Sequence, residues 1–149
     1  MFDIESKNQD EIILTTKKTS IKINVKECFI DGNLEVGKIY GPGEFEIGDM
    51  SVRGVDVGEG QTIYDVEIGG VHVGIIGGVE KGLDDLGISD VLCTSSVRAV
   101  REIEPKLVVS MGNVDGMVSE LKLTARAEKK LKIKNLEALP TSLEVVVLS

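Results

Sequence analysis

Short runs of alternating apolar and polar residues, separated by glycine-rich turns, restrict the fold of this chain most strongly. Residues 20–25 place an apolar side chain at every second position, which is the period of a strand with one buried face. Residues 62–68 and 71–76 flank Gly69-Gly70 and so predict a β-hairpin. The other predicted elements of this kind are strands at residues 11–16, 28–30, 44–47, 50–55, 90–93, 106–110, 130–134 and 143–148, and a turn at Asp31-Gly32-Asn33. The chain is therefore predicted to be strand-rich.

The second half of the sequence adds short helices between its strands. A helix is predicted over residues 95–103 with Ser95 or Ser96 as its N-cap, because a serine hydroxyl accepts a hydrogen bond from the first helical turn. A second helix is predicted to start at Asp115, as its cap, and to end at Leu121. A β-meander followed by β-α-β units is typical of the α/β and α+β classes.

Length and composition indicate a single domain that spans residues 1–149. With 42% hydrophobic and 28% charged residues, a chain of this length needs no disulfide or metal to hold its core. Cys28 and Cys93 do not form a disulfide framework. The first residues are acidic and unlike a signal peptide, and no apolar run reaches the roughly 18 residues of a membrane helix. We therefore expect a soluble, cytoplasmic protein.

The charge of the chain excludes two classes of partner. Its formal net charge is −8 and its pI is about 4.7. Nucleic acids and anionic membranes are bound through clusters of Lys and Arg, and an acidic protein repels both. The basic residues within 126–134 are interleaved with apolar ones and do not form a continuous patch. We expect neither nucleic acid nor membrane as a partner.

The sequence contains one histidine, His72. A metal-dependent hydrolase needs three or more His, Asp, Glu or Cys ligands around one point. On the predicted strand, Val71, Val73 and Ile75 share one face and His72 points to the other. A Ser-His-Asp site would need this same histidine, and the sequence has no Gly-x-Ser-x-Gly elbow to present a serine. We interpret His72 as a half-exposed strand residue and predict no catalytic residue.

Two other clusters are interpreted as structural. The glycine-rich residues 74–82 follow a strand but match no phosphate-binding motif, so a tight turn is favoured over an anion cradle. Glu44 with Glu46, and Asp65 with Glu67, share strand faces. A hard cation could bind such carboxylates, but in an acidic protein a solvated face is favoured.

Several ordered segments together resemble the metallo-β-lactamase-fold hydrolases, in the branch related to ascorbate-6-phosphate lactonase. The segments are residues 41–47, 52–54, 62–71, 104–110 and 136–148. The resemblance implies an αββα sandwich, trimmed here at its ligand loops and helices. It also implies a hydrolase that activates water with bound metal ions.

The metal ligands of that family are missing from this sequence. The early His-x-His-x-Asp-His segment has no counterpart between Ile30 and Gly37. The family's His-Leu-Gly-Asp falls on residues 75–78, which makes its aspartate position Gly78, and its Pro-Met-His ligand falls on Gly112. The resemblance therefore implies vestigial ligand positions, no metal, no cofactor and no hydrolysis.

Three functions remain open. The first is a metal-free, non-catalytic binding or scaffolding module that could form a homodimer, because shortened loops expose apolar surface or a strand edge. The second is a binder of a small anion or sugar at the remnant pocket, with serine, asparagine and backbone groups as donors. The pocket residues would be Gly77, Gly78, Ser95, Ser96, Ser110 and Asn113.

The third is residual hydrolysis at an unconventional site. It requires Asp84, Asp85 or Asp115 to converge on His72, and nothing in their spacing indicates that they do.

Overall fold

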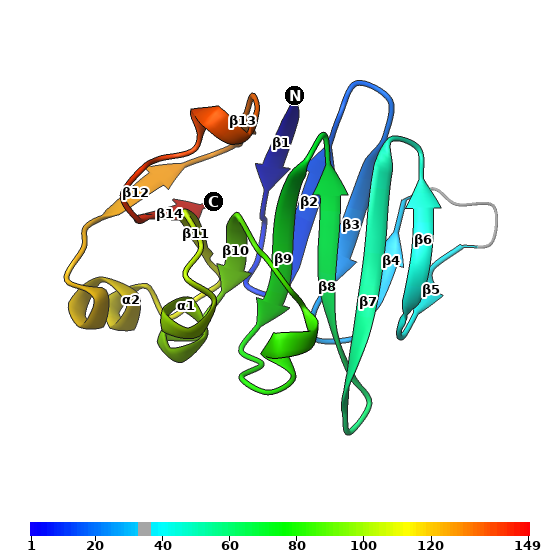
Figure 1. Ribbon diagram of the computed structural model, residues 1–149, viewed down its shortest axis with the longest axis horizontal. Coiled ribbons are helices and arrows are strands. Elements are labelled where there is room, and N and C mark those ends of the chain that lie inside the picture. The colour runs from blue at the N-terminus through cyan, green and yellow to red at the C-terminus, as the bar shows by residue number, and fades with distance from the viewer. Residues whose placement is uncertain (33–36) are drawn as a thin grey trace.

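Two β-sheets pack face to face in the computed structural model, which describes residues 1–32 and 37–149 (Figure 1). The predicted turn at Asp31-Gly32-Asn33 lies partly outside the described residues. The first sheet is antiparallel, with the strand order β13-β1-β2-β3-β4-β5. Its strands are β1 (Phe2–Glu5), β2 (Glu11–Thr15), β3 (Ser20–Asn24), β4 (Phe29–Asp31), β5 (Ile39–Tyr40) and β13 (Leu131–Ile133).

The second sheet has eight strands in the order β12-β14-β11-β10-β9-β8-β7-β6. Strands β6 to β9 form an antiparallel meander, whereas β9, β10, β11, β14 and β12 run parallel to one another. The parallel half brings the carboxyl ends of β9, β10 and β11 to one edge of the sheet. Its strands are β6 (Gly43–Ile47), β7 (Met50–Gly58), β8 (Gln61–Ile68), β9 (Val71–Gly77), β10 (Val91–Thr94), β11 (Leu107–Ser110), β12 (Ala125–Glu128) and β14 (Glu144–Leu148).

The main core lies between the two sheets and follows from the period of the strands. In β2 and β3, every second side chain is buried, including Ile12, Leu14, Ile21 and Ile23. These residues pack against inward-facing side chains of the larger sheet, such as Tyr64. The strand alternation predicted from the sequence thus becomes one apolar layer between two sheets.

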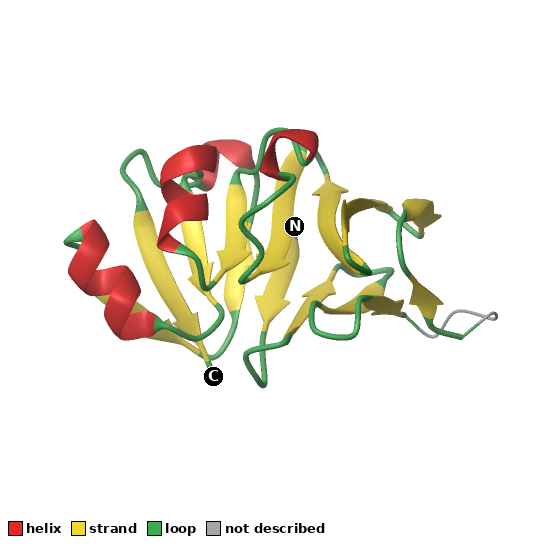
Figure 2. Cartoon of the chain, turned by 90° about the horizontal axis from the view of Figure 1, so that it is seen from below, coloured by secondary structure: helices red, strands yellow, loops and turns green. Residues whose placement is uncertain are grey.

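Two short α-helices cover part of the outer face of the eight-stranded sheet (Figure 2). Helix α1 (Val97–Ile103) is capped by Ser96, whose Oγ accepts a hydrogen bond from the Ala99 amide at 3.0 Å. Helix α2 (Val114–Leu121) follows Asn113, so the prediction of Asp115 as its cap was wrong, and Asp115 lies in the first turn. Two 3₁₀ turns, η1 (Leu83–Asp85) and η2 (Leu136–Ala138), complete the helical structure.

Within residues 1–32 and 37–149, no α-helix packs on the outer face of the six-stranded sheet. In the described residues, α-helices therefore cover one outer face of the sandwich and not the other. No helix in the described part of the chain has the length and apolar character needed to cross a membrane.

Candidate functional site

The carboxyl ends of β9, β10 and β11 meet at a small cavity of about 220 Å³. Gly78 and Gly112, the two positions that the family resemblance aligns with metal ligands, both line it although they follow different strands. The remaining lining residues come from the same strand ends and from loops of the opposite sheet: Gln9, Asp10, Val25, Gly77, Ser95, Met111 and Asn113.

Hydrogen bonds between the loops fix the shape of this cavity. The Gly77 carbonyl accepts from the Thr94 hydroxyl at 2.7 Å and from the Ser95 amide at 3.0 Å. The Asn113 side-chain amide donates to the Ser95 carbonyl at 3.0 Å. These contacts join the ends of β9, β10 and β11, so the cavity wall is built by the sheet and not by a free loop.

The structure brings most of the predicted pocket residues together. Gly77, Gly78, Ser95 and Asn113 line the cavity. Ser110 lies beside it, and its hydroxyl donates to the Gly112 carbonyl at 2.7 Å. Neither Ser110 nor the sixth predicted residue is among the residues that line it.

That residue is Ser96, whose side chain serves helix α1. Its hydroxyl caps the helix and also donates to the Glu80 carboxylate at 2.5 Å. Of the six residues named for the pocket, Gly77, Gly78, Ser95 and Asn113 therefore line this cavity, whereas Ser96 and Ser110 do not.

Gln9, Asp10 and Val25 belong to the cavity but were not predicted. Gln9 and Asp10 precede β2, and Val25 follows β3, so all three come from the smaller sheet. The Val25 amide donates to the Asp10 carbonyl at 2.8 Å, which joins the two loops. Their position at the cavity depends on how the two sheets pack together, which local sequence patterns do not predict.

The residues at the cavity do not fit the metal centre that the family resemblance implies. A Cβ atom at Gly112 would lie 3.0 Å from Gln9 Oε1, and Gly112 has a φ of +87°. A Cβ atom at Gly77 would lie 2.9 Å from Val25 Cγ2, and one at Gly78 would lie 3.2 Å from Ser95 Oγ. Side chains of the opposite sheet and of the next strand therefore occupy the space where ligand side chains would extend.

The donor set is also unsuitable for a metal. Among the nine residues that line the cavity, Asp10 is the one with an anionic side chain. In the described ranges, no group of three or more His, Cys, Asp or Glu side chains is arranged to hold a metal ion. Zinc takes four ligands drawn from these types, so the described residues at this cavity lack the donors of a zinc site.

A larger hollow of about 700 Å³ adjoins the cavity and shares Asp10, Val25 and Gly78 with it. It adds three cations, Lys26, Lys81 and Arg98, but also the carboxylates of Glu59 and Glu80. Lys81 pairs with Glu59 at 3.3 Å. The charges in this hollow are therefore balanced and do not make a strongly positive site.

His72 lies elsewhere, on the outer face of the eight-stranded sheet, and is half-exposed as predicted. Its Nδ1 lies 3.1 Å from Asp65 Oδ2, and its Nε2 lies 3.5 Å from Glu67 Oε2. Its carboxylate neighbours are therefore Asp65 and Glu67, and not the Asp84, Asp85 or Asp115 that a residual hydrolase would have required.

Asp65 departs from the prediction of a solvated carboxylate face, because the residue is only 6% exposed. Arg53 donates to the Asp85 and Leu86 carbonyls at 2.8 and 2.5 Å, and its guanidinium lies 4.0 Å from Asp65. Burial raises the pKa of Asp65 above its ordinary value, while the hydrogen bond and charge of His72 and the charge of Arg53 oppose that rise.

No family model matches the sequence, and no curated protein matches it. Among solved structures, the chain is similar to a protein from Thermotoga maritima assigned as a Zn-dependent hydrolase of the metallo-β-lactamase superfamily. The TM-score is 0.71 and the identity 16%, with 100% of each chain covered. The fold is that of a metallo-β-lactamase-like sandwich. At this identity the likeness confirms the predicted fold and shows nothing of the activity.

Proposed function

We propose that this chain is a metal-free, non-catalytic member of the metallo-β-lactamase fold that binds a small sugar at the cavity beside Gly78 and Gly112. One observation carries the proposal. The two positions that the resemblance aligns with metal ligands, Gly78 and Gly112, meet at a cavity, yet Cβ atoms there would lie 3.2 Å from Ser95 Oγ and 3.0 Å from Gln9 Oε1. A concave site with convergent polar groups is retained where the metal ligands are absent.

The absence of hydrolysis follows from the chemistry of the side chains around the cavity. Water activation without a metal needs a positioned base or nucleophile. His72 belongs to the outer face of the sheet, and Cys93 is fully buried, where desolvation raises its thiol pKa. Among the described residues that line the cavity, Asp10 carries the one ionisable carboxyl and Ser95 the one hydroxyl, and no histidine or cysteine is among them to activate that hydroxyl.

The lining favours a neutral, hydroxyl-bearing ligand over an anion. Asp10 and the side chains of Gln9, Ser95 and Asn113 offer acceptors and donors suited to hydroxyl groups. Among the described residues, no cationic side chain lines the cavity, and the neighbouring hollow balances its three cations with carboxylates. A carboxylate such as Asp10 repels an anionic ligand and accepts hydrogen bonds from a sugar.

A ligand titration followed by backbone amide NMR tests the proposal. Neutral monosaccharides are expected to give saturable shifts in residues 9–10, 77–78, 95 and 112–113, and the same concentrations of sulfate or citrate are not. Asp10→Asn should weaken binding about tenfold, the scale of one charge-assisted hydrogen bond. Asp115→Asn, which changes a carboxylate outside the cavity, serves as the matched control.

Two results would contradict the proposal. One is saturable binding of anions without any binding of sugars. The other is an equal loss of sugar binding in Asp10→Asn and Asp115→Asn, because the cavity would then play no part.

A further inference from the structure

The cavity beside Gly78 and Gly112 and the hollow of about 700 Å³ that adjoins it form one cleft, which we call the joint cleft. Asp10, Val25 and Gly78 line both parts, so a ligand in the cavity lies against residues that also line the hollow. From these residues the hollow extends to the turn between β7 and β8, to the segment after β9, and to α1.

Most of the volume of the joint cleft lies in the hollow. Binding sites for small molecules usually enclose about 300–1,000 Å³. The cavity, at about 220 Å³, is smaller than this, whereas the hollow is within the range. A ligand confined to the cavity would therefore leave the larger part of the joint cleft unoccupied.

Two cations of the hollow keep their hydrogen-bond donors available. Lys81 is engaged by Glu59, whose carboxylate lies 3.3 Å from the lysine ammonium. Neither Lys26 nor Arg98 forms an ion pair in the described ranges. Ammonium and guanidinium groups each donate several hydrogen bonds, which hydroxyl and ether oxygens of a ligand can accept.

The remaining charges of the hollow favour a neutral ligand. Apart from the paired lysine and glutamate, the lining contains Lys26 and Arg98 and, in equal number, the carboxylates of Asp10 and Glu80. An anionic ligand would be attracted by the two cations and repelled by the two carboxylates. A neutral ligand that both donates and accepts hydrogen bonds avoids that repulsion.

Aliphatic side chains lie in the same lining as these polar groups. Val25 and Val79 are half-buried, and the Gln61 amide can both donate and accept hydrogen bonds. Sugar rings carry C–H groups on their faces and hydroxyl groups around their edges. They therefore match a wall that is partly aliphatic and partly polar.

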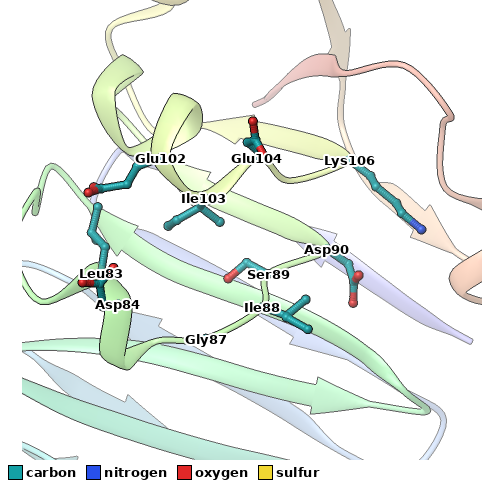
Figure 3. Close-up of a pocket in the computed structure, with 10 residues that line it drawn as sticks. All are labelled: Leu83, Asp84, Gly87, Ile88, Ser89, Asp90, Glu102, Ile103, Glu104 and Lys106. Atoms are coloured by element: carbon teal, nitrogen blue, oxygen red, sulfur yellow. The ribbon is translucent and has the colours of Figure 1, made fainter.

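A separate cavity of about 370 Å³, at the opposite end of the parallel strands, lacks this combination (Figure 3). Four carboxylates line it, and Lys106, its one cation in the described residues, is directed away from Asp84 and Glu102. Ser89 is only 4% exposed and its Oγ packs against Gly74, so this hydroxyl is closed to a ligand. Available donors and acceptors are therefore combined in the joint cleft and not in this second cavity.

We infer, on the basis of the proposed sugar binding at the cavity, that the ligand contains two linked neutral sugar units. The first unit binds in the cavity beside Asp10. The second lies in the hollow, where it packs on Val79 and accepts hydrogen bonds from Lys26 and Arg98. The ligand class is therefore a neutral disaccharide, or the end of a longer neutral chain.

Calorimetric titration of the full chain with glucose, maltose and cellobiose tests this inference, because both disaccharides consist of glucose alone. We expect one site per chain, and at least one disaccharide that binds about tenfold tighter than glucose or better. Arg98→Met keeps the aliphatic stem and removes the guanidinium. It should weaken the binding of that disaccharide about fivefold and leave the affinity for glucose within twofold.

The matched control is Arg101→Met, which changes an exposed arginine of the same helix that lines neither part of the joint cleft. Both affinities should stay within twofold of the parent. Glucose binding without tighter binding of either disaccharide would overturn the inference and leave the proposed function intact. Equal weakening of glucose and disaccharide in Arg98→Met would also overturn it, because the second unit would then have no contact of its own with the hollow. Absence of binding by all three sugars would contradict both the inference and the proposed function.

Discussion

Tyr64 is fully buried between the two sheets, and its hydroxyl has no hydrogen-bond partner in the described part of the chain. Burial raises the pKa of this hydroxyl, so it stays protonated. An unsatisfied buried hydroxyl costs about 1–3 kcal/mol, and phenylalanine removes it without changing the ring. Tyr64→Phe should therefore raise the free energy of unfolding by about 1 kcal/mol, measured by urea denaturation. A loss of stability would mean that the hydroxyl is satisfied in solution.

Asp65 makes the stability of the folded chain depend on pH in the direction opposite to that of a carboxylate whose pKa is lowered by folding. Burial raises its pKa in the folded state, so the folded chain holds the proton more tightly than the unfolded chain does. Its contribution to stability is therefore fully present below the ordinary carboxyl pKa of about 3.9, and is lost as the pH rises through the folded pKa.

Asp65→Asn isolates this contribution. The free energy of unfolding of the variant minus that of the parent should become more positive between pH 4 and pH 7, measured by urea denaturation at each pH. If the difference instead became more negative with pH, His72 and Arg53 would outweigh the burial of the carboxylate.

At the scale of elements, the turn after β11 brings Gly112 close to the side chain of Gln9. Gly112 has a φ of +87°, and a Cβ there would lie 3.0 Å from Gln9 Oε1. Gly60 has a similar φ of +74°, but a Cβ atom there would have no neighbouring atom within 4 Å. Gly60→Ala therefore measures the effect of backbone strain alone. Gly112→Ala should lose about 1–3 kcal/mol of stability through strain, and more than Gly60→Ala does, because Gln9 must also move. Equal losses in thermal or urea unfolding would show that Gln9 does not fill the site.

Sequence patterns predicted the elements whose signals are local. The hairpin of β8 and β9 follows from alternation on both sides of Gly69-Gly70, and the start of α1 follows from the Ser96 hydroxyl. Strands β1, β5 and β12 were not predicted. All three are short. Strand β1 pairs with β2, which follows it in the sequence, and with β13, which lies near the other end of the chain. Such pairings are set by tertiary contacts and not by local pattern.

The candidate site was likewise predictable only where its residues belong to neighbouring strands of one sheet. Gly77, Gly78, Ser95 and Asn113 follow three neighbouring parallel strands, whose carboxyl ends must meet. Gln9 and Val25 reach the cavity from the other sheet, so their role depends on the packing of two sheets. The burial of Asp65 likewise depends on Arg53 and His72 from neighbouring strands.

At the scale of the whole molecule, the predicted homodimer depends on the free edges of the sheets. In the described residues, β6 ends the eight-stranded sheet and β5 ends the other, with Tyr40 on β5 63% exposed. Antiparallel pairing of two β6 strands around Phe45 would place Glu44 of one copy opposite Glu46 of the other. Like charges in directly opposed positions destabilise a sheet.

We therefore expect any dimer through β6 to be weak at neutral pH. Glu44→Gln with Glu46→Gln should shift the protein toward dimer at a given concentration, measured by size-exclusion chromatography with light scattering. Asp115→Asn with Glu137→Gln, which removes the same charge away from β6, should leave the oligomeric state unchanged. If both the parent and the Glu44→Gln, Glu46→Gln variant stayed monomeric at high concentration, this result would contradict dimerisation through β6.

The proposed absence of a metal centre is tested most directly by the metal content of the purified chain. Protein produced in medium supplemented with zinc, manganese and iron, and purified without chelator, would be analysed by inductively coupled plasma mass spectrometry. Gln9 lies 3.0 Å from where a Cβ atom at Gly112 would be, and Ser95 lies 3.2 Å from where one at Gly78 would be, so we predict far less than one metal atom per chain. One or more tightly held atoms per chain would contradict this and would show that other carboxylates rebuild a centre in this fold.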